Sequence, residues 1–292
     1  GGGGLEHLNS TALIASRFGF RPESLYQGFL SLVAHEYFHV WNVKRIRPDA
    51  LGPFDYTREN YTRLLWVAEG ITSYYENLLL RRAGLLSPDE YLADLASSIQ
   101  QMQSTPGRLV MSAEEASFDA WIKYYRQDEN AVNSQVSYYA KGALLGLLLD
   151  LEIRKRSAGA RSLDDVMRYL YAEFARKGRN YSPADFQRAC ELAAGSSLET
   201  FFTRYVRGRD ELDYNAALST VGLRLDVTSG SPVTGVRARS TGGRSGSARR
   251  SGSGSKASSS ARRPTASAAS RASGSAASSS SVASSTVRRT TS

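Results

Sequence analysis

The chain has 292 residues, a single cysteine and a formal net charge of +9. This length holds one large domain or two small ones, and the lone Cys190 excludes an intrachain disulfide framework. No signal peptide and no apolar run of membrane-spanning length is visible, so the compartment stays open. Eleven Lys and Arg residues but no acidic residue follow Asp226, so the preceding part has a net charge of −2 and the basic character belongs to the end of the chain.

The first predicted helix is strongly apolar and contains SLVAHEYFHVWN at residues 31–42, in which His35, Glu36 and His39 form an HExxH motif. Positions i and i+4 share one face of a helix, so both imidazoles can hold one metal ion with Glu36 beside them. Zinc in such a site keeps one position open for water and lowers its pKa, and Glu36 could take the proton. Ordinary surface histidines are the alternative, but these groups in an apolar helix would need partners to offset their desolvation.

A third metal ligand is expected from the second predicted helix, YTRLLWVAEGITSYYENLLLRR at residues 61–82. Glu69 and Glu76 are seven residues apart and share a helix face, so one carboxylate could bind zinc while the other orients a ligand histidine. Alternatively, both are solvated helix charges. Three carboxylates in the polar connection before this helix are weaker candidates: Asp49, Asp55 and Glu59.

The remaining pattern is also helical. Ser87-Pro88-Asp89-Glu90 is a capping box with proline at the first helical position, and it begins a helix that extends to about Gln103. The apolar run 143–149 is too short to span a bilayer and is followed by charges, which indicates a core helix. Further helix starts are expected at Ser162, Ser182 and Ser197, with helix ends at Gly159, Gly178, Gly195 and Gly208.

Residues 229–292 consist mainly of Ser, Ala, Gly, Arg and Thr and contain no aromatic residue. Such a segment cannot bury enough apolar surface to offset its ordering entropy, so we expect it to be disordered. An Arg/Ser-rich arm that binds nucleic acid electrostatically is the alternative. It lacks the aromatic residues on which bases stack, and no nucleic-acid partner is expected.

The segment HEYFHVWNVKRIRP, followed by RLLWVAEGITSYYE, resembles the glycyl aminopeptidase family of gluzincin metallopeptidases. In related alanyl- and leucyl-type enzymes the third zinc ligand is the Glu of an N-E-G-F-x-S-Y segment, and the matching residues 68–74 assign this role to Glu69. The 29 residues between His39 and Glu69 exceed the alanyl-type spacing, and the inserted VKRIRPDALGPFD itself resembles the glycyl family. The resemblance implies a thermolysin-like zinc peptidase module followed by a helical bundle, with one Zn²⁺ per chain.

Two more segments fit the same resemblance. Gly3-Gly4-Leu5-Glu6-His7 is similar to the G-x-M-E-N exopeptidase motif, which implies a strand at the cleft edge and a role for Glu6 in receiving the substrate's ammonium group. Taken alone, this segment would be a flexible Gly-rich end. Residues 139–142 resemble a Y-x-K-G helix start, which places oxyanion stabilisation on Tyr139 and not on Tyr138. Without the Lys-Gly pair, both tyrosines would be interpreted as packing aromatics.

These features predict a mainly α fold with a small N-terminal strand remnant, and a zinc-dependent aminopeptidase that cleaves peptides with a free amino terminus. The resemblance implies a preference for Gly or Ala at the first position. A zinc endopeptidase of the same fold and a non-catalytic peptide-binding fragment remain alternatives.

Family members usually carry an N-terminal β domain and a C-terminal PDZ domain, for which we see no pattern. We therefore expect a fragment, with an incomplete catalytic domain at 1–228 and a low-complexity tail at 229–292; a bacterial-type cytoplasmic or periplasmic location and the oligomeric state stay open.

Overall fold

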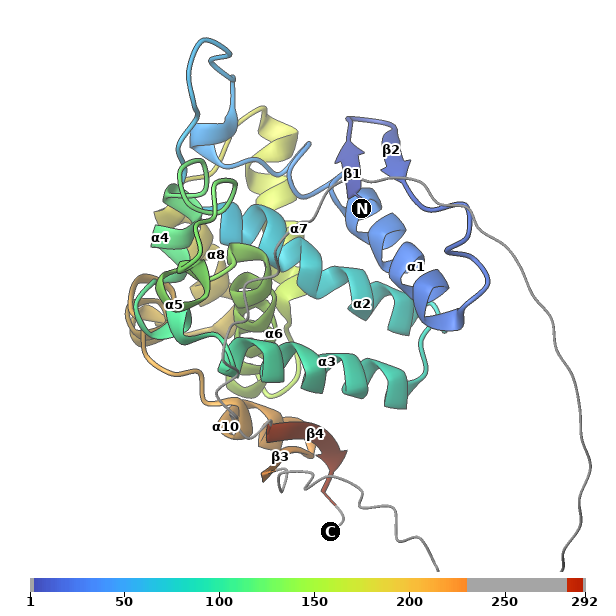
Figure 1. Cartoon of the computed structure of the whole chain (residues 1–292). Coiled ribbons are helices and arrows are strands. Elements are labelled where there is room, and N and C mark those ends of the chain that lie inside the picture. The colour runs from blue at the N-terminus through green and yellow to red at the C-terminus, as the bar shows by residue number, and fades with distance from the viewer. Residues whose placement is uncertain (1–2, 230–282, 291–292) are drawn as a thin grey trace, which may run out of the picture. The chain divides into compact units, whose positions relative to one another are not determined.

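The computed structural model describes residues 3–229 and 283–290, and these are mainly helical (Figure 1). The longer helices are α1 (Glu23–Phe38), α2 (Thr72–Arg82), α3 (Pro88–Gln103), α6 (Tyr138–Arg156), α7 (Leu163–Glu173) and α8 (Pro183–Ala194). The short helices are α4 (Ala113–Phe118), α5 (Ala131–Ser134), α9 (Glu199–Phe201) and α10 (Tyr214–Leu218), and π-helical turns cover Trp66–Ile71 and Phe202–Arg207. The predicted mainly α fold is confirmed. Within the described ranges, every helix is too short or too polar to cross a membrane.

The chain begins with a short hairpin of β1 (Gly3–Glu6) and β2 (Thr11–Ile14) beside α1 (Figure 1). The two strands are antiparallel, with Gly3 opposite Ile14 and Glu6 opposite Thr11. A two-stranded hairpin is only marginally stable by itself, so it depends on its packing against α1. The hairpin thereby holds Glu6 close to the end of the helix that carries the histidines.

Helical turns continue beyond the end of α1. The backbone N–H of Val43 and that of Lys44 both donate to the carbonyl of His39, at 3.1 and 3.0 Å, and Ile46 N–H donates to Trp41 O at 2.7 Å. Asn42 and Lys44 therefore stay beside the histidines, although they lie outside α1 itself.

The second predicted helix begins later than its sequence pattern indicates, at Trp66, and its first turn is a π-helix that runs directly into α2. This π-turn crosses α6 at a pair of glycines. A Cβ on Gly70 would lie 2.5 Å from the Cα of Gly142, and one on Gly142 would lie 2.6 Å from Trp66 O. Real Cβ contacts are essentially never that short, so two glycines are required for the backbones to approach this closely.

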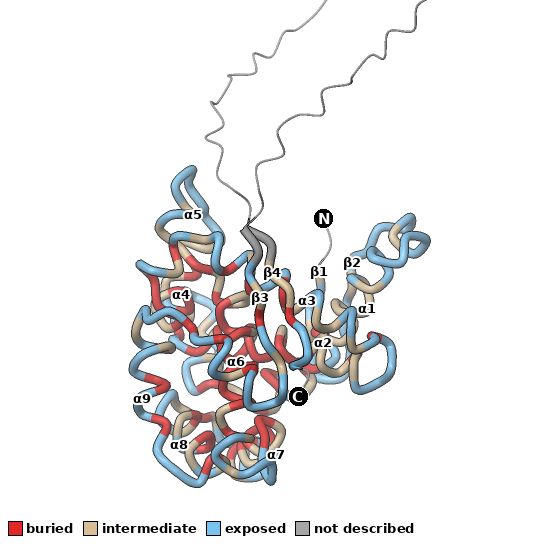
Figure 2. Tube along the Cα trace, turned by 90° about the horizontal axis from the view of Figure 1, so that it is seen from below, coloured by how far each residue is buried: buried red, intermediate tan, exposed pale blue. Residues whose placement is uncertain are grey.

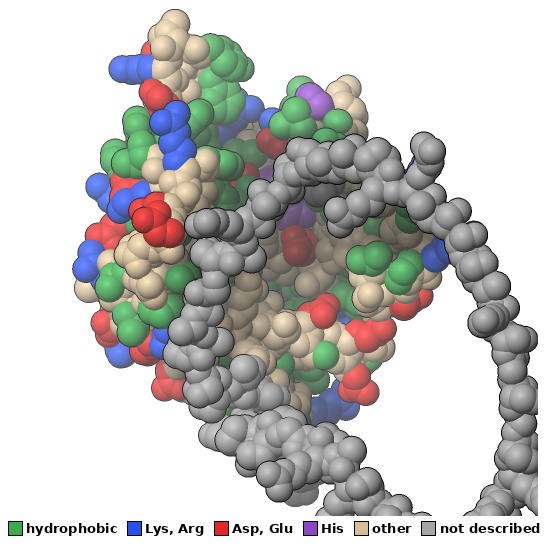
Figure 3. Space-filling model, in the orientation of Figure 1, with side chains coloured by type: hydrophobic (Ala, Val, Ile, Leu, Met, Phe, Trp, Pro, Cys, Tyr) green, Lys and Arg blue, Asp and Glu red, His purple; other side chains and the backbone are tan. Residues whose placement is uncertain are grey.

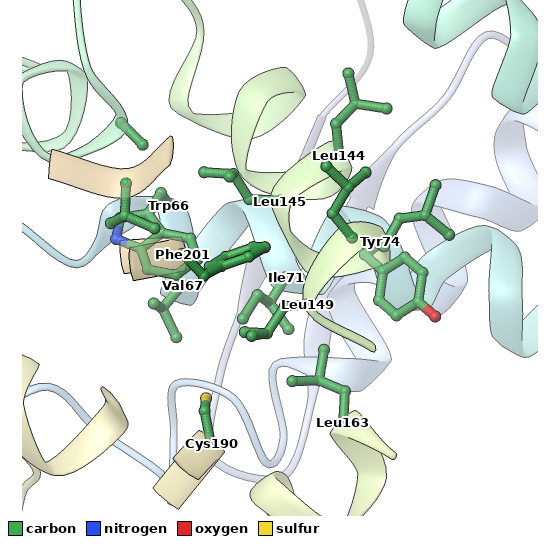
Figure 4. Close-up of a cluster of buried hydrophobic side chains, with 14 of the residues drawn as sticks. Trp66, Val67, Ile71, Tyr74, Leu144, Leu145, Leu149, Leu163, Cys190 and Phe201 are labelled. Carbon is green, nitrogen blue, oxygen red and sulfur yellow. The ribbon is translucent and has the colours of Figure 1, made fainter. Parts of the chain in front are cut away.

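Helix α6 is the centre of the core. Its residues Leu145, Leu149 and Ile153 are fully buried, and Figure 4 shows Leu145 and Leu149 grouped with Val67 and Ile71 of the π-turn. Figure 2 shows buried positions gathered around α6, with exposed residues on the outer helices. Between Gly142 and Leu149, α6 is apolar on all sides, which fits its position in the core. This core supports the π-turn that carries Glu69.

The predicted helix starts at Ser87, Ser162 and Ser182 are confirmed, each by a capping box in which serine pairs with the acidic residue three positions later. The predicted stops at Gly178 and Gly195 are confirmed as well, with both glycines left-handed at φ 64° and 71°. The prediction that residues 229–292 are disordered throughout is wrong for part of the segment. Residues Ala283–Arg289 form strand β4, which pairs with β3 (Leu223–Ser229).

Strand β4 packs against α3 as well as pairing with β3. Val287 is buried, the backbone N–H of Ser285 donates to Gln100 Oε1 at 3.3 Å, and that of Thr290 donates to Gly222 O at 2.9 Å. The stretch ASSTVRR contains one apolar β-branched residue, Val287, and no other pattern typical of a strand. Its composition therefore resembles that of the surrounding low-complexity sequence. The rest of the predicted tail, 230–282, lies outside the described residues.

Candidate metal centre

Three possible metal-donor atoms lie together at His35, His39 and Glu69. Figure 3 shows histidine and acidic side chains in a hollow of the molecular surface. Glu69 Oε2 lies 3.3 Å from the Nε2 atom of each histidine. Zinc bonds of about 2.0–2.1 Å with tetrahedral angles set neighbouring ligand atoms about 3.3–3.4 Å apart. The donor set therefore suits a tetrahedral zinc site in its chemistry and in these two distances.

The other ring nitrogen of each histidine has its own partner. His35 Nδ1 lies 2.7 Å from Glu76 Oε2, and His39 Nδ1 lies 2.6 Å from the carbonyl oxygen of Asn42. A carboxylate or carbonyl acceptor at Nδ1 fixes the proton there, so the Nε2 lone pair is available for a metal. The sequence pattern indicated a histidine-orienting role for Glu76, and Glu76 contacts His35. The partner of His39 is a backbone atom, for which the sequence carries no signal.

The electrostatics of the set favour a positive charge at its centre. Burial lowers the pKa of His35, but hydrogen bonds to Glu69 and Glu76 outweigh this and raise it to about 10. Burial acts to raise the pKa of Glu69, but hydrogen bonds to both imidazoles and their charges lower it to about 2. A carboxylate between two imidazoles thus stabilises a shared positive charge, which protons or a divalent cation can supply.

Asn42 links the two elements that carry the donors. Its side chain is fully buried, and its amide group donates to Val67 O at 2.9 Å, to Thr72 Oγ1 at 3.1 Å and to Ala68 O at 3.3 Å. Turns of π-helix leave backbone groups in unusual positions and recur at functional sites. Asn42 therefore secures the π-turn of Glu69 with its side chain while it fixes His39 with its carbonyl. No role was expected for Asn42 from the sequence, although it lies only three residues after the motif.

Glu36 lies beside the donor set with one oxygen unengaged. Its Oε2 atom is buried and has no hydrogen-bond partner within residues 3–229 and 283–290. Burial raises the pKa of Glu36, while the charges of His39 and His35 act in the opposite direction. A Cβ added to Gly4 would lie 2.2 Å from the Glu36 carboxyl carbon, so β1 passes directly over this side chain. A buried, unpartnered carboxylate oxygen is suited to accept a proton from a water molecule.

Glu6 also reaches the centre, where one of its carboxylate oxygens lies within 4.8 Å of a carboxylate oxygen of Glu36 and of a ring nitrogen of His39. It is already engaged, because Glu6 Oε1 forms an ion pair with Lys44 Nζ at 3.0 Å, and both side chains are about four-fifths buried. The three groups Glu6, Glu36 and His39 are a second possible metal set, but two carboxylates and a competing lysine fit zinc less well than His35, His39 and Glu69. No role was expected for Lys44 from the sequence, because its partner Glu6 lies 38 positions earlier in the chain.

Of the two tyrosines, Tyr139 is the one that faces the donor set. Its ring centroid lies 6.2 Å from that of His35, whereas Tyr138 is 1 % exposed and its hydroxyl contacts that of Tyr125 at 3.1 Å. Burial, and then the charge of Glu69, raise the pKa of Tyr139, so its phenol stays protonated and can donate. Gly3, predicted to contact substrate, has open space where a side chain would begin.

Residues 28–145, which include the histidines, Glu69 and Tyr139, match the sequence model of the M61 glycyl aminopeptidase family. The matched segment comprises 118 of the 292 residues. The resemblance to this family inferred from HEYFHVWNVKRIRP is thereby confirmed.

The fold is also similar to the crystal structure of an aminopeptidase N family protein from Idiomarina loihiensis, with 37% identity and a TM-score of 0.72. That match covers 77% of this chain but only 40% of the other, so the chain spans well under half the length of that protein. Among curated proteins, none matches the chain.

Proposed function

We propose that the chain is the catalytic part of a zinc aminopeptidase, with one Zn²⁺ held by His35, His39 and Glu69. The single observation that carries this proposal is the pair of 3.3 Å distances from Glu69 Oε2 to the two Nε2 atoms, next to the unpartnered oxygen of Glu36. A closed structural zinc site would use four protein ligands, commonly with cysteine. The only cysteine, Cys190, is buried in the core elsewhere, so three ligands and one open position are favoured.

The roles of the side chains follow from their positions. Bound at these donors, Zn²⁺ would lower the pKa of a water from ~15.7 towards ~7 and polarise a peptide carbonyl. Glu36 accepts a proton as the water oxygen attacks the carbonyl carbon, and it passes that proton to the amine nitrogen as the carbon–nitrogen bond breaks. The Tyr139 phenol donates to the oxygen on which negative charge develops, a contribution commonly of ~2.7–4 kcal/mol. Glu76 keeps the ring of His35 in place.

Glu6 makes the enzyme an aminopeptidase in this proposal. Its carboxylate lies within 4.8 Å of the reactive oxygen and nitrogen atoms of Glu36 and His39, at the distance where a substrate's terminal ammonium group would be attracted. The family resemblance adds a preference for Gly or Ala as the first residue. One observation favours the endopeptidase alternative, because Lys44 already neutralises Glu6 and could make a free amino terminus dispensable.

Two substrates and one variant test these assignments. The wild-type protein with zinc should hydrolyse alanine p-nitroanilide and leave its N-acetylated form intact. Equal cleavage of an acetylated and a free peptide would establish the endopeptidase instead. The Glu36→Ala protein should retain stoichiometric zinc and lose hydrolysis, while Glu23→Ala, an exposed change at the other end of α1, serves as the matched control. Activity that survives Glu36→Ala would show that the general base lies elsewhere.

A further inference from the structure

A pocket of about 240 Å³ lies where the end of α3, the segment before α5 and the start of α6 meet. Pockets for drug-sized ligands measure about 300–1,000 Å³, so this one has room for an amino-acid side chain with its backbone. Uncharged residues line it throughout, and its floor includes the buried Met102 and Val136. An ionic side chain placed there would find no counter-charge among the lining residues.

Three amide side chains line this pocket from separate segments: Gln101 of α3, Gln127 of the loop before α5, and Gln135 directly after α5. Within the described part of the chain, none of these three amide groups makes a hydrogen bond to another protein group. Each amide can both donate and accept. The pocket therefore presents free donors and acceptors above an apolar floor, a combination that suits an uncharged polar group with a short aliphatic stem.

Two aromatic rings connect the pocket to the candidate metal centre. Tyr124 lines the pocket, and its ring lies 5.7 Å from that of Tyr139, which lies 6.2 Å from the ring of His35. Ser137 and Ala140, on either side of the two α6 tyrosines, line the pocket as well.

The position of the pocket relative to Glu6 indicates which part of a peptide would reach it. Glu6 groups with Glu36 and His39, whereas Tyr139 and the pocket lie on the His35 side. In the proposed function, a substrate held at Glu6 by its amino terminus runs past His35 and Tyr139 with the residues that follow the cleaved bond. The ring centroids of His35 and Tyr139 are 6.2 Å apart, and those of Tyr139 and Tyr124 are 5.7 Å apart. A path along both distances corresponds to roughly three to four residues of extended chain at ~3.4 Å each.

We propose that this pocket, lined by Gln101, Gln127 and Gln135, binds an uncharged polar side chain such as glutamine or asparagine three to four residues after the cleaved bond. The direction of the peptide rests on the proposed aminopeptidase function. The pocket makes the protein selective for the interior of its substrate, in addition to the amino terminus.

Binding to the zinc-loaded Glu36→Ala protein tests the pocket without turnover. The ligands are two series of hexapeptides, Ala-Gly-Gly-X-Gly-Gly and Ala-Gly-Gly-Gly-X-Gly, in which X is Gln, Leu, Lys or Asp. In at least one series the Gln peptide should bind about tenfold more tightly than the Leu peptide, the equivalent of one net hydrogen bond. Adding Gln101→Ala and Gln135→Ala should abolish this difference. Gln103→Ala, the same change on α3 but at a side chain that contacts Glu211, should preserve it.

Equal affinity for all four side chains in both series would overturn the proposal, and so would a Gln preference that persists when both pocket amides are removed. Urea unfolding of each variant establishes that the binding measurements refer to folded protein. Because the readout is binding, the result is independent of catalysis. A wild-type protein that fails to cleave alanine p-nitroanilide would contradict the proposed function, whereas the hexapeptide series judge the pocket separately.

Discussion

Replacing Asn42 by alanine should weaken zinc binding although it removes no metal ligand. The substitution deletes the amide that donates to Val67 O at 2.9 Å and to Thr72 Oγ1 at 3.1 Å, and the weaker contact to Ala68 O at 3.3 Å. The carbonyl of residue 42, which accepts from His39, is a backbone atom and remains. The change therefore acts on the π-turn that carries Glu69.

The magnitude can be worked out from these contacts. Two good hydrogen bonds at about 1 kcal/mol each give a loss of about 2 kcal/mol in the free energy of unfolding. Ala68 O keeps a donor, the Thr72 hydroxyl at 2.7 Å, so its loss contributes little. Removing a group that orients a ligand from outside the coordination sphere commonly costs about 10–100-fold in metal affinity. We expect a zinc dissociation constant raised by about that factor.

Competition with a zinc-binding chromophore measures the dissociation constant, and urea denaturation of the zinc-free protein measures stability. Asn133→Ala on the exposed helix α5 removes a surface amide that donates to Asn130 Oδ1 at 2.9 Å, and it should change neither quantity. If Asn42→Ala lost stability but bound zinc as tightly as the wild type, the link between Asn42 and the position of Glu69 would be refuted.

Three further predictions concern the packing and charge around the centre. Gly142→Ala should cost about 1–3 kcal/mol in urea denaturation and reduce bound zinc, because its Cβ would lie 2.8 Å from the Cα of Gly70 and push the π-turn off α6. Burial lowers the pKa of Lys141 to about 8. The Lys141 ammonium group of the unfolded chain keeps its proton up to about pH 10.5, so the free energy of unfolding should rise by about 3 kcal/mol between pH 8 and 10.5. The Lys141→Met protein should lack this rise, so comparing the two proteins by urea denaturation isolates the contribution of Lys141. Lys44→Met frees the carboxylate of Glu6, so the KM for alanine p-nitroanilide should fall; an unchanged KM would mean that Glu6 does not meet the ammonium group.

The parts of the site that depend on local spacing could be predicted from the sequence. His35 and His39 are four residues apart on one helix, so their common face follows from helix geometry alone. The capping boxes at Ser87 and Ser182 are equally local, because each closes within three residues of the chain. The third donor, Glu69, needed the family resemblance as well as the helical pattern, since nothing in the spacing of 29 residues dictates that two helices meet.

Other contacts were decided only by the tertiary structure. Asn42 bonds to a carbonyl 25 residues away, and Lys44 pairs with Glu6 on a different element. The π-turn at Trp66–Ile71 has no distinctive local pattern, and it exists where two glycines let the backbone approach α6. Strand β4 was also missed, because one buried valine in a Ser-rich stretch carries too little signal until β3 and α3 are present to receive it.

The sequence alone therefore determined that His35 and His39 share one face of a helix, because periodicity and short spacings encode which side chains lie together, and the family resemblance added Glu69 as a candidate donor. Only the tertiary structure decided how that chemistry is held and constrained. It placed Lys44 on Glu6, Asn42 beneath the turn of Glu69, and three glutamines around one pocket. These contacts join segments far apart in the chain, and their geometry depends on how the whole core packs rather than on any local pattern.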